Sequence, residues 1–250
     1  MSIIFLKFAR EIFAKFVQRQ RMAAFRLPVV SSLRVQPAAL HVLPSFEFCN
    51  IHNKEFLGKG SYGLVYKANL KTAGGNQNVE VVVKQMLSES SEDVVGFAKE
   101  AKLLFSISHK NVVSFLGYCP EPCAIMLEYV FFDFKPFGVD KKVNSLLDFL
   151  NYLDTLNSVN MLGRELQAKI CMDIAKGLEY LHSKDTVHRD LKTANVLVSN
   201  RHYCHLTNVP DMTEACRAEP IICKLTDFGE SRSRQVQTAA LHSTTARVDR

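Results

Sequence analysis

The pattern of hydrophobic and polar positions predicts strands in the first part of the chain and helices further along. Residues 64–70 (LVYKANL) alternate between apolar and polar side chains and are rich in β-forming residues, which is typical of a strand. Residues 79–83 (VEVVV), after a glycine turn, and residues 123–130 predict two more strands. Apolar residues at helical spacing predict helices over 92–106, 145–156 and 164–183.

The apolar positions of two helices also predict which faces are buried. In the first helix these positions are Phe97, Ala101, Leu104 and Phe105, and in the third they are Leu166, Ile170, Ile174, Leu178 and Leu181. Glu100 lies in the middle of the first helix, where a carboxylate is either solvated or paired with a buried cation.

Residues 1–26 have the pattern of a basic amphipathic helix, and residues 27–45 that of a proline-containing linker. Phe5, Phe8, Ile12 and Phe16 fall on one face of the helix. Three interpretations stay open: a mitochondrial transit peptide, a contact with an anionic membrane surface, or an N-terminal extension that docks on the following domain. We expect a cytoplasmic protein, with a mitochondrial location as the alternative.

Composition and charge exclude several classes of protein. With 250 residues, 47% of them hydrophobic, the chain can bury a core and is not expected to be disordered or a disulfide-rich mini-domain. No apolar run is long enough to predict a transmembrane helix. The net charge of +6 lies within residues 1–45, so residues 46–250 are neutral overall and do not indicate nucleic-acid binding.

The seven cysteines give no metal or disulfide signature. Cys119 and Cys123 are closely spaced, but no second Cys or His pair completes a zinc site. We expect reduced and mostly buried thiols in an intracellular protein.

Glycines in a strand-rich context indicate a phosphate-binding loop. Gly58, Gly60 and Gly63 form G-x-G-x-x-G, with Val65 two positions further on. Such glycines let the backbone approach phosphate oxygens closely, although a plain hairpin turn gives the same pattern. A dinucleotide-binding unit needs a helix directly after the glycines. Here a strand follows, which favours a hairpin that covers nucleotide phosphates.

Two later segments, HRDLKTAN at 188–195 and DFG at 227–229, give the chain its resemblance to a family. Together with the glycine loop, Lys84 at the end of a strand and Glu100 in a helix, they follow the order found in eukaryotic protein kinase domains. The chain therefore resembles a protein kinase over about residues 52–250. The stretch SHKNVVSFLGYC (108–119) is similar to the tyrosine-kinase-like group.

The resemblance implies an α+β fold with two lobes. Residues 46–130 would form an N-lobe with an antiparallel sheet and one helix, and residues 131–250 a mainly helical, incomplete C-lobe. The implied activity is transfer of the γ-phosphate of ATP to Ser or Thr hydroxyls of protein substrates, with Mg²⁺ as the metal. The oligomeric state is left open.

The resemblance also assigns roles to individual residues. Lys84 would contact the α- and β-phosphates and pair with Glu100, and Asp190 would accept the proton of the substrate hydroxyl. Lys192, two residues later, is similar to the serine/threonine-kinase pattern, and Asn195 and Asp227 would hold Mg²⁺. The nucleotide would be bound by Gly58, Lys59, Gly60, Ser61, Gly63, Val65, Val82, Lys84, Leu127 as gatekeeper, and the hinge residues Glu128 and Val130.

The chain departs from the family pattern at three places. Val82 replaces an alanine that lines the adenine pocket, so weaker ATP binding is expected. Asn195 and Asp227 are 32 positions apart, which indicates an insertion at about 200–222 that we expect to form an extended hairpin loop on the surface. No A-P-E follows the DFG segment, so we expect a chain truncated within its activation loop, where Thr238, Ser243, Thr244 and Thr245 are candidate phosphosites.

Two hypotheses of different classes remain. The first is an active serine/threonine-type kinase, which the retention of Lys84, Asp190, Asn195 and Asp227 favours. The alternative is a catalytically impaired ATP-binding pseudokinase or scaffold module, which Val82 and the missing A-P-E segment favour.

Overall fold

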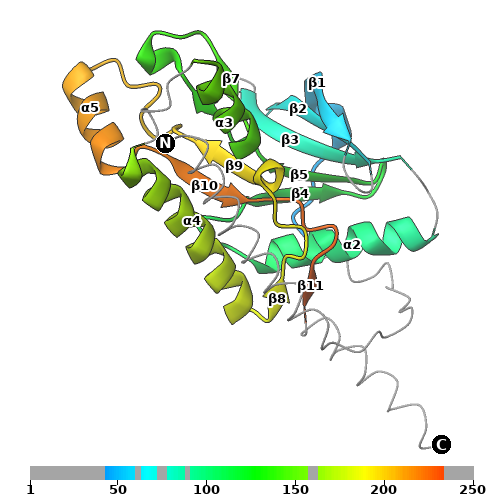
Figure 1. Cartoon of the computed structure of the whole chain (residues 1–250). Coiled ribbons are helices and arrows are strands. Elements are labelled where there is room, and N and C mark those ends of the chain that lie inside the picture. Colours follow the sequence, from blue (N-terminus) through cyan, green and yellow to red (C-terminus); the bar gives the residue numbers. More distant parts are fainter. Residues whose placement is uncertain (1–42, 60–62, 72–77, 88–90, 157–162, 234–250) are drawn as a thin grey trace, which may run out of the picture. The chain divides into compact units, whose positions relative to one another are not determined.

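A computed structural model of the chain describes residues 43–59, 63–71, 78–87, 91–156 and 163–233. These residues divide into two compact units (Figure 1). We call residues 43–108, 113–129 and 227–233 the sheet unit, and residues 109–112 and 130–226 the helical unit. Among these residues no helix is both long and apolar enough to cross a lipid bilayer. The helix expected over 1–26 lies outside the described residues.

The sheet unit consists of one antiparallel sheet and one long helix, as the resemblance implied. The strands have the spatial order β1-β2-β3-β5-β4, and a short 3₁₀ helix precedes them. The elements are η2 (Phe48–Asn50), β1 (Ile51–Lys59), β2 (Gly63–Lys71), β3 (Asn78–Met86), α2 (Ser91–Ser106), β4 (Phe115–Cys119), β5 (Ala124–Glu128) and the two-residue β11 (Arg232–Ser233). The strands predicted over 64–70, 79–83 and 123–130 and the helix predicted over 92–106 are confirmed.

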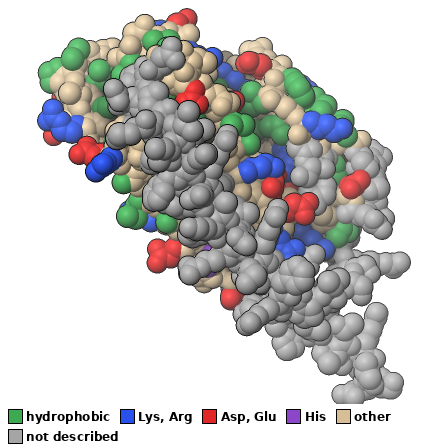
Figure 2. Space-filling view, viewed as in Figure 1, with side chains coloured by type: hydrophobic (Ala, Val, Ile, Leu, Met, Phe, Trp, Pro, Cys, Tyr) green, Lys and Arg blue, Asp and Glu red, His purple; other side chains and the backbone are tan. Residues whose placement is uncertain are grey.

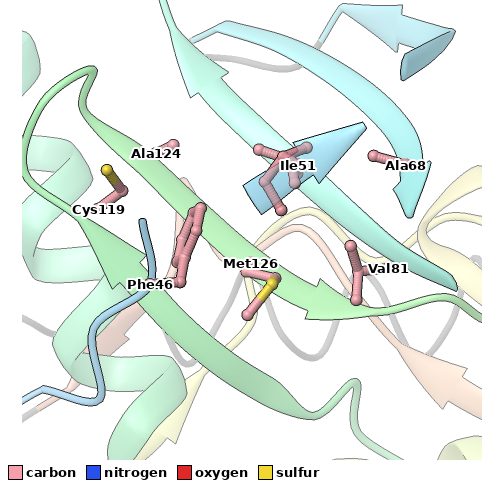
Figure 3. Close-up of a cluster of buried hydrophobic side chains, with 8 residues drawn as sticks. Phe46, Ile51, Ala68, Val81, Cys119, Ala124 and Met126 are labelled. Atoms are coloured by element: carbon pink, nitrogen blue, oxygen red, sulfur yellow. The ribbon is translucent and has the colours of Figure 1, made fainter. Parts of the chain in front are cut away.

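The side chains of the central strands alternate between the two faces of the sheet. Val81 and Val83 have no exposed surface and belong to a cluster on one face (Figure 3). The other members of this cluster are Phe46, Ile51, Ala68, Cys119, Ala124 and Met126. By the alternation of β3, Val82 and Lys84 lie on the opposite face.

The segment before the first strand is part of this packing. The Tyr118 N–H donates to the Pro44 carbonyl at 2.8 Å, and the Phe46 N–H donates to the Tyr118 carbonyl at 3.2 Å. Gly117 allows this contact, because a Cβ there would lie 3.2 Å from the Phe46 ring. The chain therefore covers one face of its own sheet before it enters β1.

The described part of the helical unit contains one 20-residue helix, two ten-residue helices and several short strands. Its elements are β6 (Phe132–Asp133), η3 (Lys135–Phe137), β7 (Lys142–Val143), α3 (Leu146–Thr155), α4 (Arg164–Ser183), β8 (Thr186–Val187), η4 (Thr193–Asn195), β9 (Val196–Ser199), α5 (Val209–Ala218) and β10 (Ile222–Leu225). The helices predicted over 145–156 and 164–183 are confirmed. Helix α4 packs against β10, and its residues Ile170, Ile174, Leu178 and Leu181 are buried while Leu166 is half-buried.

Three expectations need correction. Phe105 is 47% exposed, in the last turn of α2, where its ring makes an edge-to-face contact with Phe115. All seven cysteines are free thiols, but only Cys119 and Cys223 are buried. The insertion is not an extended hairpin loop. Strands β9 and β10 do pair in antiparallel fashion, but the segment of chain that connects them contains the ten-residue helix α5.

Candidate active site

Lys84 and Glu100 form a buried ion pair in the sheet unit. Lys84 lies on β3, opposite Val65 of β2 and Ile125 of β5, and only 5% of it is exposed. Glu100, from the middle of α2, is 4% exposed. The Lys84 Nζ donates to both carboxylate oxygens at 2.8 Å. Glu100 is therefore paired with a buried cation, the second of the two possibilities that its sequence position left open.

A second carboxylate approaches the same ammonium group. Asp227 Oδ1 lies 3.6 Å from Lys84 Nζ, and Asp227 adopts a left-handed backbone with φ of 63°. Burial raises the pKa of Glu100, and the negative charge of Asp227 adds to the effect. The Lys84 ammonium and the backbone N–H of Phe228 oppose it. Lys84 is thus held in place by one carboxylate on each of two segments that are far apart in the sequence.

The glycine loop is the tip of the β1–β2 hairpin. Gly58 pairs with Val65 and Lys59 with Leu64 across the two strands, so a strand follows the glycines and the dinucleotide-binding alternative is excluded. Gly63 has a packing requirement, because a Cβ there would overlap the carbonyl oxygen of Gln85. Gly60 and Ser61 lie outside the described residues.

Two residues expected beside the adenine base lie on one sheet face. Val82 of β3 is opposite Leu127 of β5, and the alternation of β3 puts both on the face that carries Lys84. Val82 is half-buried and Leu127 is 8% exposed. The larger side chain at position 82 therefore adds volume to the face where the resemblance places the nucleotide.

The two hinge residues have hydrogen-bond partners that the sequence did not predict. Glu128 accepts the backbone N–H of Ser114 with its Oε1 at 2.8 Å, and its own N–H donates to the Ser114 carbonyl at 3.0 Å. In the helical unit, the Val130 carbonyl accepts the side-chain amide of Asn144 at 2.6 Å. Nothing in the sequence around Ser114 or Asn144 indicates these contacts, because they depend on tertiary packing.

Three predicted residues come together in the helical unit around the Asp190 carboxylate. Lys192 Nζ donates to Asp190 Oδ2 at 2.6 Å, and Asn195 Nδ2 donates to the same oxygen at 2.9 Å. The Asn195 amide also donates to the Asp190 carbonyl at 2.9 Å. Two donors on Oδ2 fix the orientation of the carboxylate, and Oδ1 remains as the second basic atom.

This loop is tied to the segment that precedes DFG. His188 is fully buried, and its Nε2 lies 2.9 Å from the Thr226 carbonyl oxygen. The Thr226 N–H donates to the Asn195 carbonyl at 3.0 Å. Thr226 was not singled out from the sequence, although its place directly before DFG was an available signal. These two contacts join residues 188–195 to the residue that directly precedes DFG.

The residues expected to hold Mg²⁺ have suitable donor atoms. Magnesium prefers hard oxygen ligands and takes several of them from phosphates and water. Asp227 supplies a carboxylate, and Asn195 retains its amide oxygen because its Nδ2 is used on Asp190. Clusters of three or more His, Cys, Asp or Glu are absent from the part of the chain that the structure describes, but this family builds its site without one.

Comparisons with known proteins agree with this geometry. The family profile described as "Protein tyrosine and serine/threonine kinase" matches residues 51–248. A receptor-like protein kinase of Arabidopsis thaliana is 33% identical over 192 residues, which cover 76% of this chain and 18% of that protein. Serine/threonine-protein kinase 4 homolog B of Dictyostelium discoideum is 34% identical over 167 residues, which cover 66% of this chain and 13% of that protein.

The chain therefore belongs to the protein tyrosine and serine/threonine kinase family. It spans less than a fifth of the length of the two relatives described above. The candidate phosphosites Thr238, Ser243, Thr244 and Thr245 lie outside the described residues.

Proposed function

We propose that the chain transfers the γ-phosphate of ATP to Ser or Thr hydroxyls of protein substrates in an Mg²⁺-dependent reaction. The observation that carries the proposal is the Lys84–Glu100 ion pair with Asp227 beside it. Kinases need this ion pair and the DFG aspartate in place for activity. Because a buried charge pair contributes little net stability, its presence supports a role in holding the nucleotide phosphates, and the Asp190 carboxylate oriented by Lys192 and Asn195 adds the group that transfer requires.

The chain's own residues supply positioning and charge. Lys84 would hold the α- and β-phosphates, with its direction set by Glu100. Asp190 would accept the proton of the attacking hydroxyl at its carboxylate, which Lys192 and Asn195 orient. When bound, Mg²⁺ would neutralise phosphate charge, with Asp227 and Asn195 as ligands. The position of Lys192 favours Ser and Thr substrates over Tyr.

We propose that the partners of the chain are protein substrates with Ser or Thr acceptor hydroxyls. We also propose that the protein is cytoplasmic. A membrane contact through residues 1–26 and a mitochondrial location stay alternatives, since both depend on residues outside those that the structure describes. We propose no nucleic-acid partner, because residues 46–250 carry no net charge.

A second candidate function is nucleotide binding without transfer, and Val82 is the observation that favours it. Two additional methyl groups on the sheet face that carries Lys84 would crowd the base. Overpacking of this kind typically costs about 1–3 kcal/mol. Such a module would act as a scaffold whose state depends on nucleotide.

One experiment separates the two functions. The full chain is incubated with Mg²⁺ and γ-labelled ATP on a Ser/Thr-containing protein substrate, and ATP binding is measured in parallel by calorimetry. We expect Asp190→Asn to abolish transfer and leave ATP affinity nearly unchanged. Asp154→Asn is the matched control, because Asp154 is an exposed carboxylate at the end of α3.

Each outcome has a defined meaning. Transfer by the wild-type chain that only Asp190→Asn removes supports the kinase. Saturable binding of Mg-ATP without any transfer supports the scaffold module and contradicts the proposal. Equal loss of transfer and binding in Asp190→Asn contradicts the role given to Asp190.

A further inference from the structure

The insertion between β9 and β10 is an ordered part of the helical unit. Tyr203 has no exposed surface, and its hydroxyl donates to the Pro220 carbonyl at 2.8 Å. His202 Nε2 lies 2.8 Å from the Glu219 carbonyl oxygen. The start and the end of the insertion are thus bound to each other beneath α5.

Ion pairs fix the far end of the insertion to the rest of the unit. Lys110 Nζ lies 2.6 Å from Glu219 Oε1, and Lys169 of α4 lies 3.3 Å from the same oxygen. Lys169 also pairs with Asp173 at 2.6 Å, and Asp173 in turn accepts the backbone N–H of Cys223 at 2.9 Å. Helix α5 is therefore held at its C-terminal end by contacts to two other segments.

A cavity of about 310 Å³ lies where α5 faces the segment around η3, near the lower end of the size range of ligand pockets. We call it the α5 cavity. Its lining residues are Pro136, Phe137, Tyr203, Met212, Thr213, Cys216 and Arg217. Phe137 is 49% exposed, so part of its ring is accessible to a bound apolar side chain. Over α5, Figure 2 shows hydrophobic side chains (green) together with basic (blue) and acidic (red) ones, and the acidic residues of this helix, Asp211 and Glu214, are not part of the cavity lining.

One charged side chain lines this otherwise mostly apolar cavity. Arg217 is exposed and lies in the last turn of α5. Within the described ranges no carboxylate lies within 4.0 Å of its side-chain nitrogens. A guanidinium at the edge of an apolar hollow is suited to a carboxylate, which it can bind through two parallel hydrogen bonds.

Charge complementarity decides between the possible occupants. The two terminal segments outside the described residues are basic: residues 1–42 hold seven Lys or Arg and one Glu, and residues 234–250 hold three Arg and one Asp. They do not complement Arg217. A nucleic acid needs several basic side chains to neutralise successive phosphates, and the cavity lining has one.

We propose that the α5 cavity is a docking site for an acidic peptide segment of another protein. The segment would place an apolar side chain against Phe137 and Met212, and a neighbouring Asp or Glu carboxylate would pair with Arg217. This inference goes beyond the proposed phosphotransfer and does not depend on it, because the cavity contains none of the residues assigned to nucleotide or catalysis.

The test uses three pools of fluorescein-labelled heptapeptides and fluorescence anisotropy on the full chain. The first pool combines Leu, Phe or Met with an adjacent Asp or Glu, and the second has Lys or Arg in place of the acids. In the third, Ser replaces the apolar residues. We expect only the first pool to saturate at concentrations up to about 1 mM.

Two variants probe the cavity and one serves as the control. Arg217→Glu should lower the affinity for the first pool about tenfold, which is the loss expected for one charge-assisted pair. The same variant should bind the basic pool. Phe137→Ser should lower the affinity for the first pool and should not bind the basic pool. Arg201→Glu makes the same charge change at an exposed residue outside the cavity lining and should leave all three pools unchanged.

Several results would overturn the proposal. The first is equal binding of the acidic and basic pools, and the second is no saturation by the first pool. The third is a loss of affinity for the first pool in Arg201→Glu as large as that in Arg217→Glu. Sedimentation of the wild-type chain adds one more: self-association that Arg217→Glu abolishes would mean that a second copy occupies the cavity. The comparison of pools on the wild-type chain stays decisive even where a variant fails to fold.

Discussion

The ammonium group of Lys84 lies 2.8 Å from both carboxylate oxygens of Glu100, and the two side chains are only 7% and 3% exposed. A buried ion pair contributes little net stability, because the attraction is offset by the loss of hydration of both charges. Removing one partner is different, since it leaves the other charge buried and uncompensated. We therefore infer that the pair serves function rather than net stability, and that removal of one partner destabilises the sheet unit.

We predict that Lys84→Met lowers the free energy of unfolding by about 3–5 kcal/mol and abolishes phosphotransfer. The double variant Lys84→Met/Glu100→Met should regain most of the lost stability, because neither charge remains, yet stay inactive. Thermal unfolding and a phosphotransfer assay on the same samples give both quantities.

Lys67→Met is the matched control for this prediction. Lys67 also lies in a strand of the sheet unit and pairs with Glu80 at 2.7 Å, but both side chains are partly exposed. Because solvent screens such a pair, Lys67→Met should lower the free energy of unfolding by less than about 1 kcal/mol. A loss as large as that of Lys84→Met would show that burial does not distinguish the two pairs.

The extra methyl groups of Val82 should weaken nucleotide binding. Val82→Ala removes them from the sheet face that carries Lys84. If the wild-type residue crowds the base by about 1–3 kcal/mol, the dissociation constant for Mg-ATP should fall about tenfold in the variant. Calorimetric titration with Mg-ATP measures the change directly.

Val83→Ala is the control for position 82, because it makes the same substitution on the opposite face of β3. Val83 has no exposed surface and lies in the core cluster. The Val83→Ala substitution should lower the free energy of unfolding by about 2 kcal/mol and leave the Mg-ATP dissociation constant unchanged. Unchanged affinity in Val82→Ala would refute the crowding hypothesis.

Much of the fold and the Lys84–Glu100 ion pair were predictable because their signals are local. The run of β-branched residues at 79–83 gives β3, and helical spacing gives α2 and α4. The alternation of β3 then sets the face on which Lys84 lies. The order of short motifs identified Lys84, Glu100, Asp190 and Asn195 before their contacts were visible, since each motif carries the chemistry that phosphoryl transfer requires.

Features that depend on tertiary packing were not predictable in this way. The contact of Asn144 with the Val130 carbonyl joins side chain and backbone 14 positions apart, with no motif at either end. Helix α5 was missed for another reason. Pro210 near its start, Asp211 in its first turn and Arg217 in its last turn are ordinary helix signals, whereas the 32-position spacing of Asn195 and Asp227 by itself predicts only an extended hairpin loop.

The ion pairs of Glu219 should make the stability of the helical unit depend on pH. Burial alone would raise the pKa of this carboxyl, but the hydrogen bond from Lys110 and the charges of Lys169 and Lys110 outweigh burial and hold it below its usual range. Because the folded-state pKa is lowered, the stabilisation is fully present above the ordinary value of 4.5 and is lost as the pH falls through the folded-state pKa.

We therefore expect Glu219→Gln to lower the free energy of unfolding by about 0.5–1 kcal/mol at neutral pH, a range set by the partial exposure of the pairs. The difference from wild type should shrink as the pH falls below 4.5. Urea unfolding at several pH values measures it. Glu214→Gln, an exposed residue of the same helix, should show no such pH-dependent difference, and an identical profile would contradict the role of Glu219.

Gly177 allows α4 to approach the segment 109–112 and β10 closely. A Cβ at this position would lie 2.7 Å from the Asn111 carbonyl oxygen and 3.0 Å from a methyl carbon of Leu225. The same carbonyl accepts the Leu225 N–H at 2.9 Å, so it cannot retreat without loss of that bond. We predict that Gly177→Ala destabilises the helical unit by about 1–2 kcal/mol, because overpacking outweighs the higher helix propensity of Ala.

Gly163→Ala provides the comparison at the other end of α4, where a Cβ would meet nothing within 4 Å. Gly163 is the N-cap residue of α4, where Ala is less favourable than Gly, so its replacement should lower the free energy of unfolding by about 0.5 kcal/mol through this local effect alone. For a chain of this size, each kcal/mol corresponds to about 2–4 °C in Tm. A Tm for Gly177→Ala equal to that of Gly163→Ala would mean that α4 can move away from Asn111 at little cost, and the close approach would then not be required for the fold.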